Sequence, residues 1–369
     1  MSPATEPSPV PGAPGAPGAP GDPDRRVRCP LCLDTVRWGD VGDELYSFAD
    51  GAGYRPLVLP PTTSPEKRAG VLRTAHIRCP NQSGDTPRHY LPLLYSIYQQ
   101  PIVVGFVGAS LSGKTHLLAA MIGEIENGGL ARYGLQAVAL DLNRHRSFLN
   151  SHTRPLLERG DKLQGTREGV VDFADALLIS SPAGTWPVTF FDIGGEDLGQ
   201  LRDNTRFLNG VTALVFVLDS DIVTGRSGRT GGRPADETYR SVLSLLHPGA
   251  GLLDVPAAVV INKSDIHRFD PPVENWLRRP APAGLDPERI LAESRDAYAF
   301  LHRAGATALL EPYRTCRRCT LHFASATGGE ARGSGYPGGV RPMRVLEPLV
   351  ALLAMSGVLA EPAAQEVGR

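Results

Sequence analysis

The sequence has few cysteines, almost no net charge and no long apolar run, and each shortage excludes a class of protein. Five cysteines in 369 residues are too few and too unevenly spaced for a secreted disulfide framework. Lys plus Arg number 38 and Asp plus Glu number 39, so no strong field draws the chain to nucleic acid or membrane. The apolar run Pro348–Ala360 is shorter than the roughly 20 residues that a membrane span needs.

The N-terminal stretch is also poor in large side chains. Residues 1–26 are mostly Pro, Gly and Ala, without the basic start and apolar core of a signal peptide. A segment with so little to bury is expected to be a disordered tail. The sequence therefore predicts a soluble, cytoplasmic protein with no membrane span.

The remaining chain divides by composition. Residues 27–98 form a loop-rich stretch that contains cysteines, and residues 361–369 are expected to be a tail. In residues 99–360, apolar runs alternate with helical patterns, which is typical of an α/β fold. The runs 211–219 and 255–262 are continuously apolar, as in central parallel strands covered on both faces. Two further runs are expected to pair antiparallel, "VDFADALLIS" from residue 171 and "WPVTFFDIG" from residue 186.

The stretch "GASLSGKT" has the spacing of a phosphate-binding loop between a strand and a helix. Its glycines let the backbone turn where a side chain would collide with phosphate, and the loop amides then point inward. Lys114 is expected to neutralise the β- and γ-phosphates, and the Thr115 hydroxyl to bind Mg²⁺. The predicted phosphate-binding residues are Gly108, Ala109, Ser110, Leu111, Ser112, Gly113, Lys114 and Thr115.

The stretch "NKSD" ends an apolar run and indicates which base is bound. The Asp265 carboxylate can accept both N1–H and the exocyclic amine of guanine, whereas adenine offers a lone pair there. Such a site rejects the wrong base by roughly 10⁴-fold, because buried polar groups are left unpaired. Lys263 can lie along the base, and Asn262 can brace the phosphate loop.

Two weaker motifs agree with a guanine nucleotide. In "FFDIGGEDL", Asp192 would hold Mg²⁺ through a water, and the Gly195 amide would contact a γ-phosphate. In "ASATGG", the Ser325–Ala326 pair follows the last expected strand, and the Ala326 amide can donate to guanine O6.

The order of these motifs resembles the Ras-like, translation-factor-related (TRAFAC) P-loop GTPases. The amino-acid sequence between about Leu91 and Leu359 looks most like that of the bacterial zinc-ribbon GTPases known as the double-GTPase family. The resemblance implies a P-loop G domain with a mostly parallel sheet flanked by helices, preceded by a small zinc-ribbon-like module. It also implies that Thr166 in "QGTRE" is the switch threonine, although by spacing alone Thr153 and Thr185 compete.

One residue departs from the Ras-like pattern. A Gln usually follows the Asp-x-x-Gly element and orients the attacking water, but here that position is Glu196. A carboxylate is repelled by a γ-phosphate, yet it can accept a proton from water if its pKa is raised. Hydrolysis, with Lys114, Thr166 and Glu196 as the catalytic candidates, is therefore a weaker expectation than binding.

The cysteines predict a zinc site. Cys29 and Cys32 have the spacing of a metal knuckle, and His76 and Cys79 have the spacing of a second half. These four residues, Cys29, Cys32, His76 and Cys79, are the expected Zn²⁺ ligands. Alternatively, Cys79 begins a knuckle whose second cysteine has become Gln82, and His89 is then the fourth ligand.

Three hypotheses are open for the role of Cys316 and Cys319. They can bind a second metal with His322, complete the first site, or remain free thiols. The basic stretches "DRRVR" and "RTCRRC" lie beside cysteines but have no interleaved aromatic residues, so a solvated surface is expected rather than a nucleic-acid site.

These features together favour a GTP-binding switch that hydrolyses GTP slowly to GDP with Mg²⁺. The zinc-ribbon module would serve structure or docking, and a protein effector or regulator would read the GTP state. The alternatives are a GTP-dependent scaffold that does not hydrolyse GTP and, less favoured because of "NKSD", an ATP-using P-loop protein.

Overall fold

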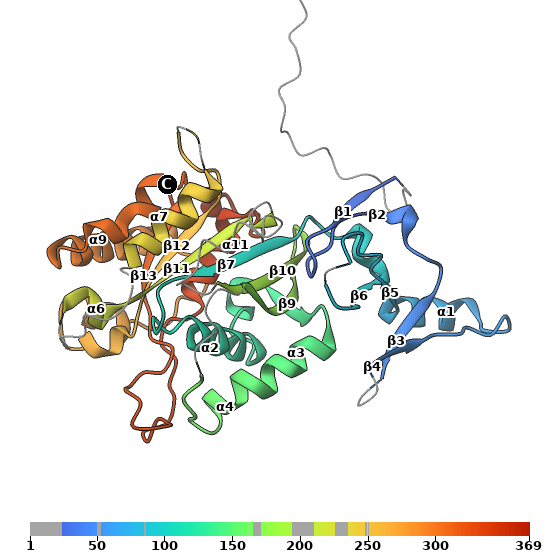
Figure 1. The fold of residues 1–369 in the computed structure, drawn as a ribbon, viewed down its shortest axis with the longest axis horizontal. Coiled ribbons are helices and arrows are strands. Elements are labelled where there is room, and N and C mark those ends of the chain that lie inside the picture. Colours follow the sequence, from blue (N-terminus) through green and yellow to red (C-terminus); the bar gives the residue numbers. More distant parts are fainter. Residues whose placement is uncertain are drawn as a thin grey trace, which may run out of the picture.

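A seven-stranded sheet forms the centre of the molecule (Figure 1). The computed structural model describes residues 24–49, 53–84, 86–164, 171–193, 210–225, 235–247, 249 and 251–369. The strand order is β13-β12-β11-β7-β10-β9-β8, and neighbours are parallel except in the two pairs that involve β9. The strands are β7 (Ile102–Val107), β8 (Gln136–Ala139), β9 (Val171–Ser181), β10 (Gly184–Ile193), β11 (Ala213–Asp219), β12 (Ala257–Asn262) and β13 (Cys319–Phe323).

Helices cover both faces of this sheet, which is why its central strands are apolar throughout. In β7, Val104 and Phe106 join the core on one face, while Val103 and Val107 join the core on the other. The described helices are α2 (Lys114–Glu126), α3 (Leu142–Phe148), α4 (Arg154–Leu157), α6 (Ser220–Thr224), α7 (Ala235–Leu246), α8 (Val273–Arg278), α9 (Pro287–Arg303), α10 (Glu311–Thr315) and α11 (Glu347–Met355).

The N-terminal part consists of short strands and one helix. A two-stranded sheet pairs β1 with β2, and a four-stranded antiparallel sheet has the order β4-β3-β5-β6. The elements are β1 (Arg26–Arg28), β2 (Thr35–Arg37), β3 (Leu45–Ala49), β4 (Gly53–Pro56), α1 (Pro65–Thr74), β5 (His76–Arg78) and β6 (Tyr90–Pro92).

The N-terminal part shares a core with the central sheet. Its buried residues, among them Ile77, Leu91 and Tyr95, pack in one cluster with Leu140, Ala176 and Leu178 of the α/β part. The two parts are therefore joined by apolar contacts as well as by the chain.

The predicted fold class is confirmed, since the structure is α/β with a mostly parallel sheet flanked by helices. The expected antiparallel pair is also present, as β9 and β10. Within the described part of the chain, no helix has the length and apolarity required to cross a bilayer.

The expectation of a tail at residues 361–369 is wrong, because these residues pack against the sheet. Ala364 and Val367 are buried, and the Cys319 amide donates to the Gly368 carbonyl over 3.0 Å. The Arg318 guanidinium donates to the carbonyls of residues 355, 364, 365 and 367, at distances of 2.7–3.4 Å. One cation thus donates to backbone carbonyls at the ends of two helices, α11 and the 3-10 helix Pro362–Glu366, where helical donors run out.

We predict that Arg318→Ala lowers the free energy of unfolding by about 2 to 3 kcal/mol, because the substitution leaves several half-buried carbonyls without their charged donor. Urea unfolding followed by circular dichroism measures this. Arg317→Ala is the matched control: Arg317 forms an exposed ion pair with Asp254, worth less than about 1 kcal/mol. Equal losses for the two variants would contradict this role of Arg318.

Candidate functional site

The candidate site lies where the parallel strands of the central sheet end. β7, β10, β11, β12 and β13 run in one direction, so their carboxyl ends meet at one edge of the sheet. The "GASLSGKT" loop follows β7, while Asp192, Asp219 and Asn262 lie at or near the ends of β10, β11 and β12, and Ser325 follows β13. Ligands of open α/β sheets bind at this edge.

The loop after β7 requires glycine at two positions. A Cβ on Gly108 would lie 2.5 Å from the Val217 carbonyl oxygen. Gly113 has a φ of +86°, and a Cβ there would lie 2.5 Å from Asn262 Nδ2. Only glycine fits both places. The outer part of the loop is formed by Ala109, Ser110 and Leu111, and the leucine side chain is exposed.

The interior of the loop holds a buried cation and a buried hydroxyl. Lys114 Nζ donates to the carbonyls of Gly108, over 2.8 Å, and Ala109, over 3.3 Å. The Ser112 hydroxyl is buried and has no hydrogen-bond partner among the described residues. A buried ammonium group and a buried hydroxyl without a partner suit the oxygens of a phosphate chain.

The two residues predicted to bind Mg²⁺ lie side by side. Thr115 follows Lys114 at the start of α2, and its hydroxyl donates to Asp192 Oδ2 over 2.8 Å. Asp192 is buried near the end of β10. A hydroxyl and a carboxylate at this separation are hard oxygen donors of the kind that Mg²⁺ prefers beside a phosphate.

Asn262, the last residue of β12, connects the phosphate loop to the loop after β13. Its Nδ2 donates to the Ser112 carbonyl over 3.0 Å. Its Oδ1 accepts from the Ala326 amide over 3.2 Å. One buried amide side chain therefore fixes the spacing between the two loops that were predicted to bind opposite ends of a nucleotide.

Lys263 adopts a left-handed backbone conformation, with a φ of +56°. Its Nζ donates to the Leu111 carbonyl over 2.9 Å and pairs with Asp219 Oδ2 at 2.5 Å. The stem of the lysine is thereby held across the top of the phosphate loop. The sequence motifs did not predict Asp219 as a site residue. Its position as a carboxylate at the end of the apolar strand β11, next to β12, could have indicated it.

Asp265 lies in the short 3-10 helix Ser264–His267, which follows Lys263. Its Oδ1 accepts from the Ser325 hydroxyl over 2.5 Å, and Ser325 in turn accepts from the Gly328 amide over 2.8 Å. This chain of hydrogen bonds fixes the orientation of the carboxylate, which a residue that reads a base edge requires.

Three predicted residues, Thr166, Gly195 and Glu196, lie outside the described part of the chain. The two rival switch threonines are described and lie elsewhere. Thr153 is buried against α2 and donates to the Ala119 carbonyl. Thr185 lies near the start of β10, at the opposite end of that strand from Asp192. Thr153 is thus committed to a bond with α2 and Thr185 lies at the far end of β10, so Thr166 stays the predicted switch residue.

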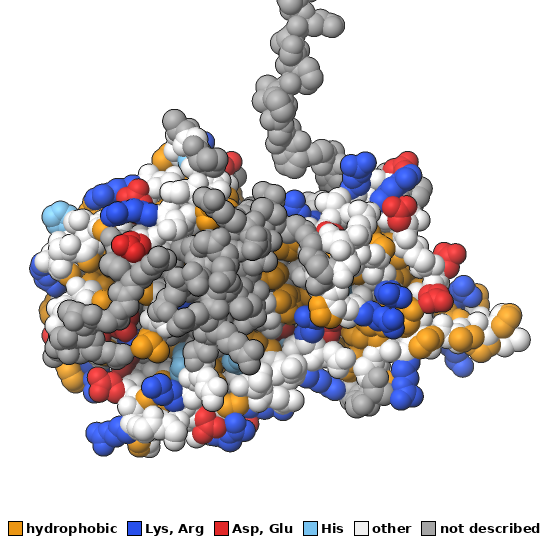
Figure 2. All heavy atoms as spheres, viewed as in Figure 1, with side chains coloured by type: hydrophobic (Ala, Val, Ile, Leu, Met, Phe, Trp, Pro, Cys, Tyr) orange, Lys and Arg blue, Asp and Glu red, His pale blue; other side chains and the backbone are white. Residues whose placement is uncertain are grey.

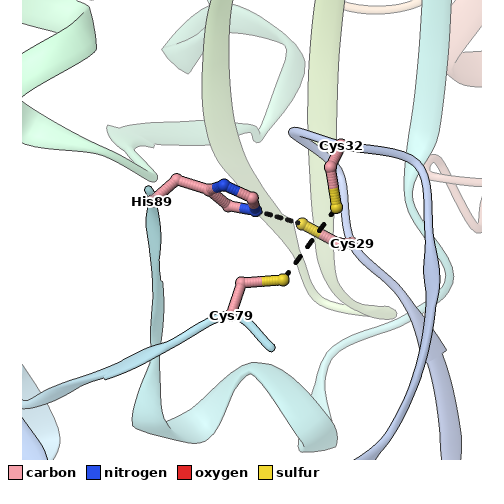
Figure 3. Close-up of side chains that lie close together, drawn as sticks. All are labelled: Cys29, Cys32, Cys79 and His89. Carbon is pink, nitrogen blue, oxygen red and sulfur yellow. Dashed lines mark hydrogen bonds between the residues drawn. The ribbon is translucent and has the colours of Figure 1, made fainter. Parts of the chain in front are cut away.

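A second site is formed by three cysteines and one histidine (Figure 3). The side chains of Cys29, Cys32, Cys79 and His89 point toward a common centre, and their ligand atoms lie within 4.8 Å of one another. The Cys32 and Cys79 sulfurs are 3.9 Å apart, and Cys29 Sγ is 3.2 Å from His89 Nε2. Ligands of tetrahedral Zn²⁺ lie about 3.5 to 3.8 Å apart, so the donor set fits this ion.

The surroundings of this cluster, Cys29, Cys32, Cys79 and His89, suit metal binding as well. His89 Nδ1 lies 2.8 Å from the Pro87 carbonyl, so it carries the proton and leaves the Nε2 lone pair toward the sulfurs. Hydrogen bonds from Cys29 and then Cys32 lower the pKa of Cys79 to about 4. A thiolate is thus already favoured at one ligand position.

His76, the expected fourth ligand, is not part of the cluster, and His89 takes its place. β5 explains the difference, because Ile77 is buried in the core cluster that contains Cys79, while successive side chains alternate between the faces of a strand. His76 consequently points to the other face, where its ring lies 4.9 Å from that of Tyr54.

Cys316 and Cys319 do not gather metal ligands in the described structure. Both are buried in the apolar core beside α10, and burial raises the pKa of Cys316 to about 12. His322, which had been considered as their partner, instead lies 3.0 Å from the Glu293 carboxylate. Of the three hypotheses, the one in which Cys316 and Cys319 are free thiols fits this geometry.

The charges on the face shown in Figure 2 are mixed. Lys and Arg side chains lie among Asp and Glu over the N-terminal part and do not merge into one basic surface. Arg37, for example, pairs with Asp24. The described residues of the N-terminal part therefore offer no continuous basic track for a phosphate backbone on this face.

Comparison with known proteins gives structural likeness only. No family model matches the chain, and no curated protein matches it. One solved structure similar to the chain is an ADP-ribosylation-factor-like GTP-binding protein, the small COPII coat GTPase SAR1 from Encephalitozoon cuniculi in complex with GDP. It aligns at 16% identity with a TM-score of 0.26, over 64% of this chain and 73% of that chain. A bacterial selenocysteine-specific elongation factor aligns at 15% identity with a TM-score of 0.27, over 62% of this chain. The chain spans about a quarter of that factor, 26% of its length.

The metal cluster leads to a prediction that separates the two histidines. Purified protein should carry about one Zn²⁺ per chain. His89→Ala should lower the zinc content and the affinity for Zn²⁺ by at least about tenfold, because it removes one of four ligands. His76→Ala should retain the metal. Elemental analysis and competition with a chromophoric chelator measure both quantities.

Cys316→Ala is a further control, because it removes a buried thiol away from the cluster and should leave the zinc content unchanged. Retention of a full equivalent of zinc by His89→Ala, or its loss in His76→Ala, would contradict the assignment.

Proposed function

We propose that this protein binds GTP and GDP at the edge of the central sheet and hydrolyses GTP slowly. The observation that carries the proposal is the position of Asn262, which joins the phosphate loop to the loop that presents Ala326. The same strand end continues into Lys263 and Asp265. A phosphate-binding loop and a base-reading carboxylate are thereby held at a fixed separation.

The choice of guanine rests on the base-reading side of the site. Asp265 is buried, and its carboxylate is oriented by Ser325. A carboxylate in this position can accept both hydrogens on the Watson–Crick edge of guanine, and the Ala326 amide can donate to O6. Adenine would leave both groups unpaired in a buried place, which costs several kcal/mol in total.

At the other end of the site, the chain supplies charge and oxygen ligands. Lys114 would neutralise the β- and γ-phosphates, and Thr115 and Asp192 would hold Mg²⁺. Bound Mg²⁺ would withdraw charge from the transferred phosphoryl group. Thr166, Gly195 and Glu196 complete the proposal as the residues that would respond to the γ-phosphate and place the attacking water.

For the cluster of Cys29, Cys32, Cys79 and His89 we propose a structural Zn²⁺. All four side chains are protein ligands, so no open position is left for catalysis. The N-terminal strands have three to five residues each, and a metal would stabilise such short elements. A docking role for this module, with a protein that reads the GTP state, belongs to the same proposal.

Base preference gives the first test of this function. GDP should bind roughly 10⁴-fold tighter than ADP. Asp265→Asn should weaken GDP binding about 10- to 100-fold, because the buried base edge loses its charged acceptor, and should favour XDP, whose C2 oxygen can accept from the new amide. Isothermal titration with GDP, ADP and XDP measures these affinities.

Asp254→Asn is the control for this series, because Asp254 is an exposed carboxylate that forms an ion pair with Arg317. It should bind all three nucleotides like the unaltered protein. Equal affinity of the unaltered protein for ADP and GDP would overturn the assignment of the base pocket.

Hydrolysis is tested separately from binding. We expect single-turnover GTP hydrolysis on the order of 10⁻⁴ to 10⁻² s⁻¹, the range of switches without an activating partner. Lys114→Ala should abolish nucleotide binding and turnover together. Glu196→Ala should change the rate and leave the GDP affinity within about threefold, because the phosphates are still neutralised.

If Glu196→Ala hydrolyses GTP at the unaltered rate, Glu196 has no catalytic role. If the unaltered protein binds GTP but shows no hydrolysis even with cell extract added, a GTP-dependent scaffold replaces the switch.

A further inference from the structure

The loop that follows the base pocket leaves the site and returns to it. Ser325 and Met343 exchange two backbone hydrogen bonds, of 3.0 and 2.8 Å, and the Arg341 amide donates to the Thr327 carbonyl over 2.9 Å. Gly328 has a φ of +70°, and any Cβ there would collide with the Arg341 carbonyl oxygen. Residues 328–341 are therefore anchored at both ends beside Asp265, and in Figure 1 the loop extends toward α2 and α4.

The far end of this loop is fixed to the segment after α4. The Tyr336 amide donates to the Gly160 carbonyl over 2.7 Å, and the Lys162 amide donates to the Ser334 carbonyl over 2.8 Å. A Cβ on Gly335 would lie 2.9 Å from the Gly160 carbonyl oxygen, so the two backbones approach closely. Tyr336 itself packs against the main core cluster. These contacts hold its backbone in one place.

The Tyr336 side chain lies beside the start of α2. Its ring centroid is 6.2 Å from that of His116, with an edge-to-face angle of 76°. His116 directly follows the magnesium-site residue Thr115, and its Nε2 accepts from the Leu163 amide over 3.2 Å. Burial, and then the positive charge of Lys263, lower the pKa of His116 to about 4, so the ring is neutral and can accept this bond.

The Tyr336 phenol is also influenced by residues of the base pocket. Burial raises the pKa of the Tyr336 phenol, a hydrogen bond with the Thr327 side chain lowers it, and the Asp265 carboxylate raises it. Thr327 directly follows Ala326, whose amide was assigned to guanine O6. The loop that carries Tyr336 thus begins at the residues that would read the base, and it brings the Tyr336 ring to the helix that begins the phosphate site.

We propose that Tyr336 is a nucleotide-binding residue, which packs against the guanine nucleoside from the side of Thr327 and His116, while Lys263 packs from the side of Leu111. The inference rests on the proposed function, because it assigns a further residue to the same guanine site. An aromatic ring next to a base is worth a 5- to 150-fold change in affinity, by the roughly 1–3 kcal/mol measured for stacked bases. Tyr336 itself belongs to none of the sequence motifs that predict the site.

The test compares a ligand that has a base with one that lacks it. Tyr336→Leu keeps apolar volume against the core and removes the ring, and Tyr336→Phe keeps the ring and removes the hydroxyl. By titration calorimetry with Mg²⁺ present, Tyr336→Leu should weaken GDP binding roughly 5- to 100-fold, with tripolyphosphate affinity unchanged within about twofold. Tyr336→Phe should bind GDP within about threefold of the unaltered protein.

Tyr313→Leu is the matched control, because Tyr313 is a partly buried tyrosine packed against the other core cluster. It should change neither affinity. If Tyr336→Leu binds GDP as tightly as the unaltered protein, or loses affinity for GDP and tripolyphosphate equally, Tyr336 does not contact the nucleoside and the inference fails. If the unaltered protein itself does not bind GDP, the proposed function fails first, and the two results are thereby distinguished.

Discussion

The candidate nucleotide site depends on the hydrogen bonds of one side chain, the Asn262 amide. It donates to the Ser112 carbonyl and accepts from the Ala326 amide, so it connects the loops after β7 and β13 across the end of β12. Neither bond is possible unless the strands are parallel and end at one edge. Burying the Asn262 amide without these two hydrogen bonds would cost free energy of folding. The spacing between the two loops therefore follows from the requirement that both bonds form.

The elements that the sequence predicted well are those whose signal is local. The apolar runs of β11 and β12, the glycines of the phosphate loop and the Asn262–Asp265 stretch each specify their own conformation within a few residues. His89 differs, because its role depends on which face of β5 carries Cys79 and on where the chain returns after residue 88. Spacing alone favoured His76, and only the pairing of β5 with β3 and β6 excludes it. Tyr336 and Arg318 are likewise defined by partners far along the chain, which no local pattern reveals.

The N-terminal module is less independent than its composition suggests. Its cysteine cluster shares a core with Ala176 and Leu178 of β9, so the metal ligands rest directly on the central sheet. Leu33, which follows Cys32, belongs instead to the core cluster that contains Phe191 and Ile193 of β10. A Cβ on Gly210 would lie 3.0 Å from its side chain. Two separate apolar contacts therefore link the cluster to the α/β part.

These contacts also connect the candidate metal site to the candidate nucleotide site. Phe191 and Ile193 lie in the same core cluster as Leu33, and Asp192, the candidate magnesium ligand, lies between them on β10. The conformation of residues 29–34 is set by the cysteine ligands and by bonds such as Cys29 N to Asp34 O. Interiors packed to crystal-like density transmit shifts of one side chain to its neighbours. The strand that carries Asp192 is packed against Leu33, which follows the cysteine cluster, so the two candidate sites are connected by apolar packing as well as by the chain.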